Sequence, residues 1–526
     1  MEHRAVSQND SPVRIDLLGY RPGDPKTAVV LGGERWFEVV RASDDTVAYR
    51  AELPTAVPDA MSGDAVALAD FSAVKEADEY YLRTEHGRSD VFPIAEEVYS
   101  GVAHAALRFF YLQRCGMQLP EELAGRWAHP ACHVEDVRVA GTGELRRCDG
   151  GWHDAGDYGR YVVAAAKTAL DLLLSWRDHP GALAKDAVGI LAEVRWGLEW
   201  MLTMQREDGG VYHKVTTPHF TALDSPPNGP QERGQVLSPV SATATGDFAG
   251  TLAYASLFYQ HDTPFAARML AAARYAFDWL EAHPDEPGFC NPEGVTTGQY
   301  GDDCDADERC LAAAALYAVT GEERYHAAMK RTLGRGVGLS WANVGLYPAV
   351  IYTALPQEKR DPETDAKARQ LLLGEAEKLL AISKKDGYGL SLTRYYWGCN
   401  GTVADNANVL LLADRLSPNA EMRECALDHL HYLLGRNTND ICYVTGFGPR
   451  CACRPHHRLS VGMGAVPPGM LAGGPNPSHQ DKVQQERYAG LAPAKHYVDQ
   501  WEAYASNEVD TYWNSPLVYL LSAFAD

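Results

Sequence analysis

The sequence predicts a mainly α-helical protein in which a small β-sandwich precedes an α/α barrel. Two observations predict this fold. Before residue 96, short runs alternate apolar and polar residues between turn residues, which is typical of strands with one buried face. After Pro93 the apolar period changes to about 3.6 residues, and many expected helices are apolar nearly all round, as helices are when both faces are covered.

The first domain is expected to span residues 1–95. Its alternating runs include 14–18, 36–40 and 79–83. Successive side chains of a strand point to opposite faces, so each run can turn one apolar face toward a second sheet. The helical period begins at Tyr99, which places the second domain at 96–526.

The second domain repeats one theme, an Ala- and Leu-rich helix followed by a loop rich in Gly, Pro, Asp and aromatic residues. The expected helices are 98–115, 158–178, 186–205, 246–260, 263–283, 308–319, 322–334, 364–384, 402–415, 418–435 and 514–525. Such helices joined by long loops favour a ring of helical hairpins. An α-solenoid is the alternative, but the chain has no fixed repeat period. The longest loops, which we expect to carry function, are 206–245, 284–307, 336–362 and 437–513.

Composition and charge exclude several classes of partner. The formal net charge of −22 disfavours nucleic acid and anionic membranes, because both need a basic face. No run is long enough to span a membrane, and the start of the chain lacks the basic and apolar segments of a signal peptide. Eleven scattered cysteines fit reduced thiols or metal ligands. These features predict a cytoplasmic protein, although a truncated secreted chain would look the same.

The stretch 150–159 places two carboxylates, Asp154 and Asp157, three residues apart between glycines. Glycine allows a tight turn, so both side chains can point toward one water molecule. The alternative is an Asx-turn that caps the following helix. That alternative explains one aspartate but leaves the rest of the stretch without a role.

Two thiols and two imidazoles lie near this stretch in the sequence: Cys115, Cys132, His133 and His153. Two thiolates and two imidazoles form the tetrahedral ligand set that zinc prefers, and four protein ligands indicate a structural site. Unrelated buried cysteines and exposed histidines are the alternative. A metal at His153 would fix the loop that carries Asp154.

Glu508 lies among aromatic residues just before the last apolar helix. In an apolar cleft its pKa would rise and it would donate a proton at neutral pH. A solvated charge at a helix start is the commoner case. Two aspartates and a protonated glutamate are the groups needed to hydrolyse a glycosidic bond.

Three further clusters have both a functional and a structural interpretation. His456 and Arg458 offer donors for sugar hydroxyls, or belong to a basic surface. The run 300–308 concentrates oxygen donors that suit calcium, or forms a solvated acidic loop. The run 395–400 is an aromatic platform if exposed, or part of the core.

Together these residues resemble glycoside hydrolase family 9, the inverting β-1,4-glucanases or cellulases, in the subgroup with an N-terminal immunoglobulin-like domain. The resemblance covers nearly the whole chain. It rests on Asp-Ala-Gly-Asp at 154–157, Pro-His-His-Arg at 455–458, Asn507-Glu508 followed by Asn514, and Leu-Gly-Tyr at 18–20. It implies an immunoglobulin-like domain at 1–95 and an (α/α)6 barrel at 96–526.

The resemblance also implies roles for single residues. Asp157 matches the general base, Asp154 a residue that helps to hold the water, and Glu508 the general acid. The positions that match substrate-binding residues are His456, Arg458, Tyr300, Trp397 and Trp513. Cys115, Cys132, His133 and His153 resemble the zinc site of the subgroup, and Asp303, Asp307 and Glu308 lie near the family's calcium site.

The sequence departs from the family at Asp510, where a small residue is usual. A carboxylate there could raise the pKa of Glu508 or contact an unusual substrate group. The expected activity is hydrolysis of β-1,4-glucans or cello-oligosaccharides by an endoglucanase. The alternatives are an exo-acting enzyme on imported oligosaccharides, such as an exo-β-glucosaminidase or a cello-oligosaccharide hydrolase, and, more remotely, a non-catalytic carbohydrate-binding protein.

Overall fold

The computed structural model describes residues 11–487 and 490–525. The start of the chain, on which the expectation about a signal peptide rests, falls partly outside these ranges. Within them, no helix has both the length and the apolar character needed to cross a membrane.

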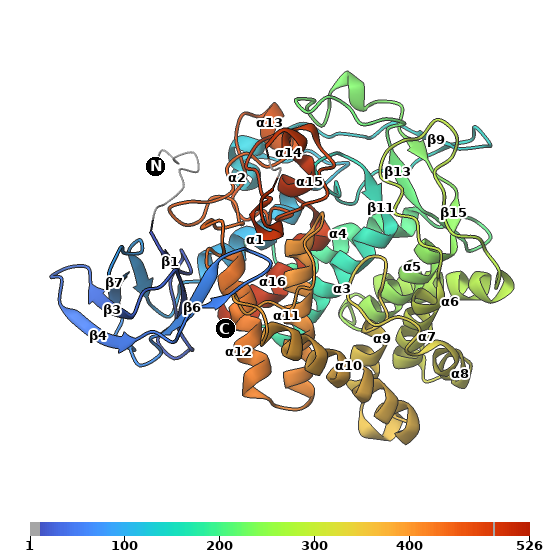
Figure 1. Cartoon of the computed structure of the whole chain (residues 1–526). Coiled ribbons are helices and arrows are strands. Elements are labelled where there is room, and N and C mark those ends of the chain that lie inside the picture. The colour runs from blue at the N-terminus through green and yellow to red at the C-terminus, as the bar shows by residue number, and fades with distance from the viewer. Residues whose placement is uncertain (1–10, 488–489, 526) are drawn as a thin grey trace.

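The N-terminal domain is a β-sandwich, as predicted (Figure 1). Its strands in the described residues pair into two antiparallel sheets, with the orders β1-β2-β6-β5 and β4-β3-β7-β8. Between the sheets, the ring of Tyr20 packs edge to face on Phe71 and Phe92 at centroid distances of 5.0 and 5.3 Å. The strands are β1 (Val13–Arg14), β2 (Thr27–Leu31), β3 (Trp36–Arg41), β4 (Val47–Glu52), β5 (Val57–Pro58), β6 (Ala65–Asp70), β7 (Asp78–Arg83) and β8 (Phe92–Ile94).

A buried polar contact joins the sandwich to the helical domain at α12 (Ala420–Leu433). Nδ1 of His431 lies 2.9 Å from Oδ2 of Asp16, and Oη of Tyr99 lies 3.3 Å from the same oxygen. The backbone N–H of Leu17 donates to the carbonyl of Leu434. The first helix begins at Ser100, six residues after Ile94 ends β8, and the predicted boundary at 96 lies between them.

The helical domain is the predicted barrel, with an inner and an outer ring in the described residues (Figure 1). The inner helices are α3 (Val162–Asp178), α5 (Ala242–Ser256), α7 (Ala306–Thr320), α9 (Tyr347–Thr353), α11 (Cys399–Leu416) and α16 (Thr511–Ala525). Each inner helix packs on one outer helix. In the order of their inner partners, the outer helices are α4 (Ile190–Thr203), α6 (Thr263–Ala282), α8 (Glu323–Thr332), α10 (Pro362–Ser383), α12 and α1 (Ser100–Leu112). Because α16 packs on α3, the ring closes.

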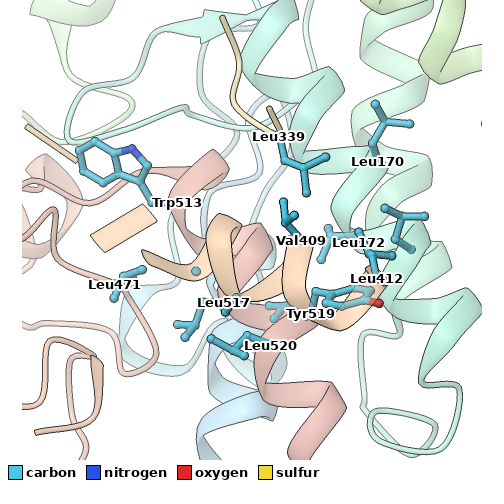
Figure 2. Close-up of a cluster of buried hydrophobic side chains, with 14 of the residues drawn as sticks. Leu170, Leu172, Leu339, Val409, Leu412, Leu471, Trp513, Leu517, Tyr519 and Leu520 are labelled. Carbon is cyan, nitrogen blue, oxygen red and sulfur yellow. The ribbon is translucent and has the colours of Figure 1, made fainter. Parts of the chain in front are cut away.

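Figure 2 shows part of the core where three inner helices meet. Each buried Leu or Val side chain there contributes about 1.5–3 kcal/mol relative to an exposed one. This packing makes the inner ring a rigid support for the loops at its ends. The residues include Leu170 and Leu172 of α3, Val409 and Leu412 of α11, and Leu517 and Leu520 of α16.

Several short elements were not predicted, and residues 160–161, near the start of the expected helix 158–178, form a strand instead. The inner helix α9 lies in the expected loop 336–362, because seven residues are too short to show a helical period. A five-stranded sheet has the order β10-β9-β14-β13-β11, and β12 pairs with β15. These strands are β9 (Val137–Val139), β10 (Leu145–Arg146), β11 (Arg160–Tyr161), β12 (Val211–Tyr212), β13 (Lys214–Thr216), β14 (Val236–Leu237) and β15 (Val240–Ser241). The short helices are α2 (Glu121–Ala124), α13 (Arg458–Gly462), α14 (Lys482–Arg487) and α15 (Tyr504–Asn507).

Candidate active site

The predicted catalytic residues lie on loops that precede inner helices. The loop with Asp154 and Asp157 leads through β11 into α3, and α16 begins three residues after Glu508. Tyr300 precedes α7, and Trp397 precedes α11. The ring of helices therefore brings these distant segments together at one end of the barrel.

The loop 150–159 does not cap α3. The residue before that helix is Tyr161, whose side chain makes no capping hydrogen bond. Oδ2 of Asp154 instead accepts a hydrogen bond from Oη of Tyr300 at 2.7 Å, and its Oδ1 accepts one from Oγ1 of Thr511 at 3.2 Å. The backbone of Asp154 is also fixed, because its carbonyl accepts from the N–H of Thr511. Asp154 is thus held by the loop before α7 and by the first residue of α16, and it does not cap α3.

Gly156 brings the loop into contact with Glu508. Its N–H donates to Oε1 of Glu508 at 3.3 Å. A Cβ at this position would lie 2.3 Å from the carbonyl oxygen of His456 and 2.9 Å from Oε1 of Glu508. Real Cβ atoms do not come this close, so the approach requires glycine.

The surroundings of Glu508 favour its protonated form. Burial and the nearby carboxylate of Asp157 raise the pKa of Glu508 to about 8, although Arg458 opposes the rise. The N–H of Gly156 also opposes the rise, and Nε1 of Trp397 donates to Oε2 of Glu508 at 3.1 Å, but burial is the largest effect. Glu508 can therefore hold a proton at neutral pH and donate it to a bound group.

Asp157 and Asp154 lie in the same buried environment but have different neighbours. Burial raises the pKa of Asp157, and the cations of Arg458 and Lys214 oppose this rise. Burial also raises the pKa of Asp154, and the hydroxyls of Tyr300 and Thr511 oppose this rise. Of the two aspartates, Asp157 is the one with cationic neighbours that stabilise its carboxylate.

His456 is a neutral imidazole beside Glu508. Burial lowers the pKa of His456 to about 4. Its Nδ1 lies 2.6 Å from the carbonyl oxygen of Trp501, and a carbonyl can only accept, so Nδ1 carries the proton. Nε2 is then an acceptor for a hydroxyl group.

Arg458 and His457 position the catalytic loop. The guanidinium of Arg458 donates to the carbonyl of Gly156 at 3.0 Å and to the carbonyl of Thr221 at 2.8 Å. Nε2 of His457 lies 3.0 Å from Oε1 of Gln113, whose amide donates to the carbonyl of His153 at 3.1 Å. Sequence reasoning missed Gln113, since a glutamine at the end of an apolar helix gives no signal of such a contact.

The three predicted aromatic residues differ in exposure. Trp397 is 37% exposed and packs beside Tyr504 at a centroid distance of 5.3 Å. Tyr300 is half-buried and contacts Tyr161 at 4.4 Å. Trp513 is only 5% exposed and covers Gly398, so its ring belongs to the packed interior that Figure 2 shows.

Phe220 is a further exposed aromatic residue that the sequence analysis did not identify. It is 53% exposed, and the guanidinium carbon of Arg458 lies 5.8 Å from its ring centroid. The adjacent Thr221 bonds to Arg458, which ties this loop to Gly156. Phe220 therefore lies near the catalytic loop, although 63 residues separate it from Asp157 in the sequence.

The four predicted zinc ligands are buried together. Nδ1 of His133 lies 3.5 Å from Sγ of Cys115 and 3.4 Å from Nε2 of His153, which is 3.7 Å from Sγ of Cys132. A tetrahedral zinc site with ordinary bond lengths has ligand-to-ligand distances of about 3.3–3.8 Å. The donor set and its spacing thus fit zinc.

The acidic run 300–308 does not act as one cluster. Asp303 is exposed, whereas Asp307 and Glu308 are buried at the start of α7. A third buried acid is Asp247 of α5, which was not predicted because it lies about 60 residues earlier in the sequence. All four carboxyl oxygens of Asp247 and Glu308 are buried without a hydrogen-bond partner. Unpaired buried oxygens of this kind fit a cation such as calcium.

A barrel of paired helices with a glutamate beside two aspartates at one end has the acidic groups that a glycoside hydrolase needs. Comparison with known families agrees with this class. The model of glycosyl hydrolase family 9 matches residues 99–521, and that of the cellulase N-terminal ig-like domain matches residues 8–89. The chain therefore belongs to glycosyl hydrolase family 9, in the subgroup with the N-terminal immunoglobulin-like domain.

Individual relatives cover nearly the whole chain. A cellodextrinase of Butyrivibrio fibrisolvens is 34% identical over 98% of this chain and 100% of its own length. The structure of a mutant thermostable endoglucanase from Alicyclobacillus acidocaldarius superposes with a TM-score of 0.92 at 35% identity, over 98% of this chain and 100% of the other. The structure of a Zn-binding triple mutant of the family 9 endoglucanase J30 has a TM-score of 0.91 at 33% identity, over 96% of this chain and 99% of the other.

Proposed function

We propose that the protein hydrolyses β-1,4-glycosidic bonds in glucans or cello-oligosaccharides with inversion, as an endo-β-1,4-glucanase. Glu508 protonates the oxygen of the leaving sugar while the glycosidic C–O bond breaks. Asp157 removes a proton from the water whose oxygen bonds to the anomeric carbon, and Asp154 helps to hold that water. The observation that carries the proposal is the contact of Gly156, between the two aspartates, with Glu508.

The choice of acid and base follows from the neighbours of each group. Glu508, with a pKa of about 8, keeps its proton at neutral pH and can release it to a leaving group. Arg458 and Lys214 favour the ionised form of Asp157, which a base requires. The same Arg458 holds Gly156, so one side chain both orients the loop and supports the base.

A neutral sugar chain is the substrate that these surroundings favour. Trp397 and Phe220 offer exposed flat faces on which sugar rings can stack. Nε2 of His456 can accept a hydrogen bond from a sugar hydroxyl. The cellodextrinase and endoglucanase names of the relatives support a β-1,4-glucan as the substrate.

The function is tested by product analysis. We expect cellohexaose to give several shorter oligosaccharides, with the α-anomer as the first product in proton NMR. A β-anomer as first product would refute inversion, and glucose alone from one chain end would favour the exo-acting alternative. Hydrolysis of chitosan oligomers but not of cellohexaose would favour the exo-β-glucosaminidase. Binding of oligosaccharides without hydrolysis would favour the non-catalytic alternative.

We also propose that Cys115, Cys132, His133 and His153 bind a structural zinc ion. The ligand atoms would be the two Sγ atoms, Nδ1 of His133 and Nε2 of His153, which face one another. Oε2 of Glu232 lies 3.9 Å from Nε2 of His133 and would orient that ring. Zinc would then hold His153, the residue before Asp154, in place. The Zn-binding mutant of J30, which has a similar fold, supports the proposal that a protein of this fold can bind zinc.

For calcium, we propose Asp247 and Glu308 as the central ligands, with Asp307 nearby. Their unpaired oxygens support this set over the one that includes the exposed Asp303. A cation would join α5 to α7, two neighbouring inner helices. It would also compensate the repulsion between these carboxylates, which otherwise raises the pKa of Glu308 beyond the effect of burial.

A further inference from the structure

Asp510 is a buried carboxyl group to which the mechanism above gives no role. It lies two residues after Glu508 and is 2% exposed. Its Oδ1 accepts a hydrogen bond from the N–H of Tyr512 at 3.0 Å. Its Oδ2 lies 3.3 Å from Oη of Tyr300.

The hydroxyl of Tyr300 therefore lies between two carboxyl groups. It is 2.7 Å from Oδ2 of Asp154 and 3.3 Å from Oδ2 of Asp510. A phenol has one proton to donate, so it cannot donate fully to both. The carboxyl group that does not receive this proton can donate to the phenol oxygen if it is protonated, and its oxygen then avoids repulsion by the oxygen of the phenol.

The distances indicate which group carries the proton. Bonds from a hydroxyl to a carboxylate are short, about 2.5–2.7 Å, which agrees with the contact between Tyr300 and Asp154. Asp154 also accepts from Oγ1 of Thr511, so both of its oxygens have hydroxyl donors. Oδ2 of Asp510 has the longer contact, so the phenol proton is directed to Asp154 and the proton between Tyr300 and Asp510 has to come from the carboxyl of Asp510.

We propose that Asp510 is a positioning residue that remains protonated at neutral pH and donates to Tyr300, which directs the tyrosine hydroxyl to Asp154. The order of donation is Asp510 to Tyr300 to Asp154. Asp510 thus fixes the residue that helps to hold the attacking water and does not itself touch the substrate. The part of this inference that concerns catalysis rests on the function proposed above.

The groups that face Asp510 agree with a neutral side chain. They are Asp154 on the loop before α3, Glu508 on the same segment, Tyr300 on the loop before α7, and Tyr512 in the first turn of α16. Burial and the two acids raise the pKa of Asp510 well above its ordinary value. A neutral Asp510 also has no charge with which to attract an amino sugar.

Infrared spectroscopy tests the protonation state without substrate. We expect the difference spectrum between the wild type and Asp510→Asn at pH 7 to contain the C=O band of a protonated carboxyl, shifted in D2O. Loss of a carboxylate band instead would overturn the proposal. This readout holds even if the protein acts on a different sugar, so its failure is separate from failure of the proposed function.

Kinetics on a cello-oligosaccharide test the positioning role. The amide of Asp510→Asn can donate to Tyr300, so we expect kcat/KM within about threefold of wild type and the alkaline limb of its pH profile unmoved. Asp510→Ala, which has no donor, should lower kcat by about tenfold, the value of one net hydrogen bond. In a Tyr300→Phe background, Asp510→Ala should have little further effect.

Three outcomes would contradict the positioning role. An alkaline limb lowered by about one pH unit in Asp510→Asn would mean that a charged Asp510 had been raising the pKa of Glu508. Equal losses in Asp510→Asn and Asp510→Ala would mean that no donor is needed. Additive losses with Tyr300→Phe would mean that Asp510 does not act through the tyrosine. If Asp510→Ala does not fold, the infrared spectrum and pH profile of Asp510→Asn still decide the question.

Discussion

Gly156 and Glu508 are 352 residues apart in the sequence, and the N–H of the glycine donates to the carboxyl of the glutamate at 3.3 Å. This contact joins the first catalytic loop to the segment just before the last inner helix of the barrel. It requires that α16 pack on α3 and close the ring.

Gly156→Ala is expected to lower both activity and stability. The added Cβ would meet the carbonyl of His456 and the carboxyl of Glu508, at a cost of about 1–3 kcal/mol in the free energy of unfolding. Displacement of the acid should lower kcat at least about 100-fold. The matched control is Gly374→Ala in α10, where the Cβ meets no atom within 4 Å and should stabilise the helix by about 0.5–1 kcal/mol. Denaturant unfolding measures the stability of the two variants, and kcat measures their activity. Similar values for Gly156→Ala and Gly374→Ala would contradict the close contact between Gly156 and Glu508.

Glu508→Gln should abolish most turnover and preserve binding. An amide cannot supply the proton for the leaving group, and general acid catalysis contributes about 10²–10⁴-fold. The kcat on cellohexaose and the Kd by calorimetry separate the two effects. The control is Glu502→Gln on the same segment, which is exposed and should behave as wild type. Undiminished turnover in Glu508→Gln would remove Glu508 from the role of acid.

The pH dependence of kcat/KM should be bell-shaped. Glu508 is active while protonated, so activity is lost as the pH rises through its pKa of about 8. Asp157 is active while ionised, so activity is lost as the pH falls through its pKa, which burial raises above 3.8. Arg458→Met removes a cation that stabilises the carboxylate of Asp157 and should move the acid limb to higher pH. A shift to lower pH would contradict the assigned base.

Removal of zinc should loosen the catalytic loop. Cys132→Ser is expected to bind less zinc than wild type by elemental analysis, with a Tm at least about 4 °C lower. Cys304→Ser changes an exposed thiol and should keep both values. Equal zinc content in the two variants would reject the site as described.

Calcium should stabilise the barrel through Glu308. Addition of calcium to chelator-treated protein is expected to raise the Tm of the wild type, because the cation pairs with buried carboxylates. Glu308→Gln should lose this response, whereas Asp303→Asn, a change at an exposed residue, should keep it. If Asp303→Asn lost the response and Glu308→Gln kept it, the acidic run 300–308 would be the calcium site instead.

The β-sandwich, the barrel and the loops that carry the acids were all predictable from the sequence. Apolar residues recur every second position in the strands and about every 3.6 positions in the helices. These periods are local properties of the sequence, so they can be read without knowledge of the fold. Asp154, Asp157 and Glu508 were recognisable because each lies in a short distinctive run. The short helix α9 and the small sheets were missed, since two to seven residues do not establish a period.

The partners of each side chain were decided by the tertiary structure alone. Sequence patterns do not show that Trp513 is buried, that Arg458 holds Gly156, or that Asp247 faces Glu308. These contacts join residues from different loops and helices, and they exist only when the ring closes. Burial and neighbouring charge then set the pKa of Glu508 and the proton position at Asp510. The sequence thus determined which chemical groups are present, and the packing of the barrel decided which of them act together.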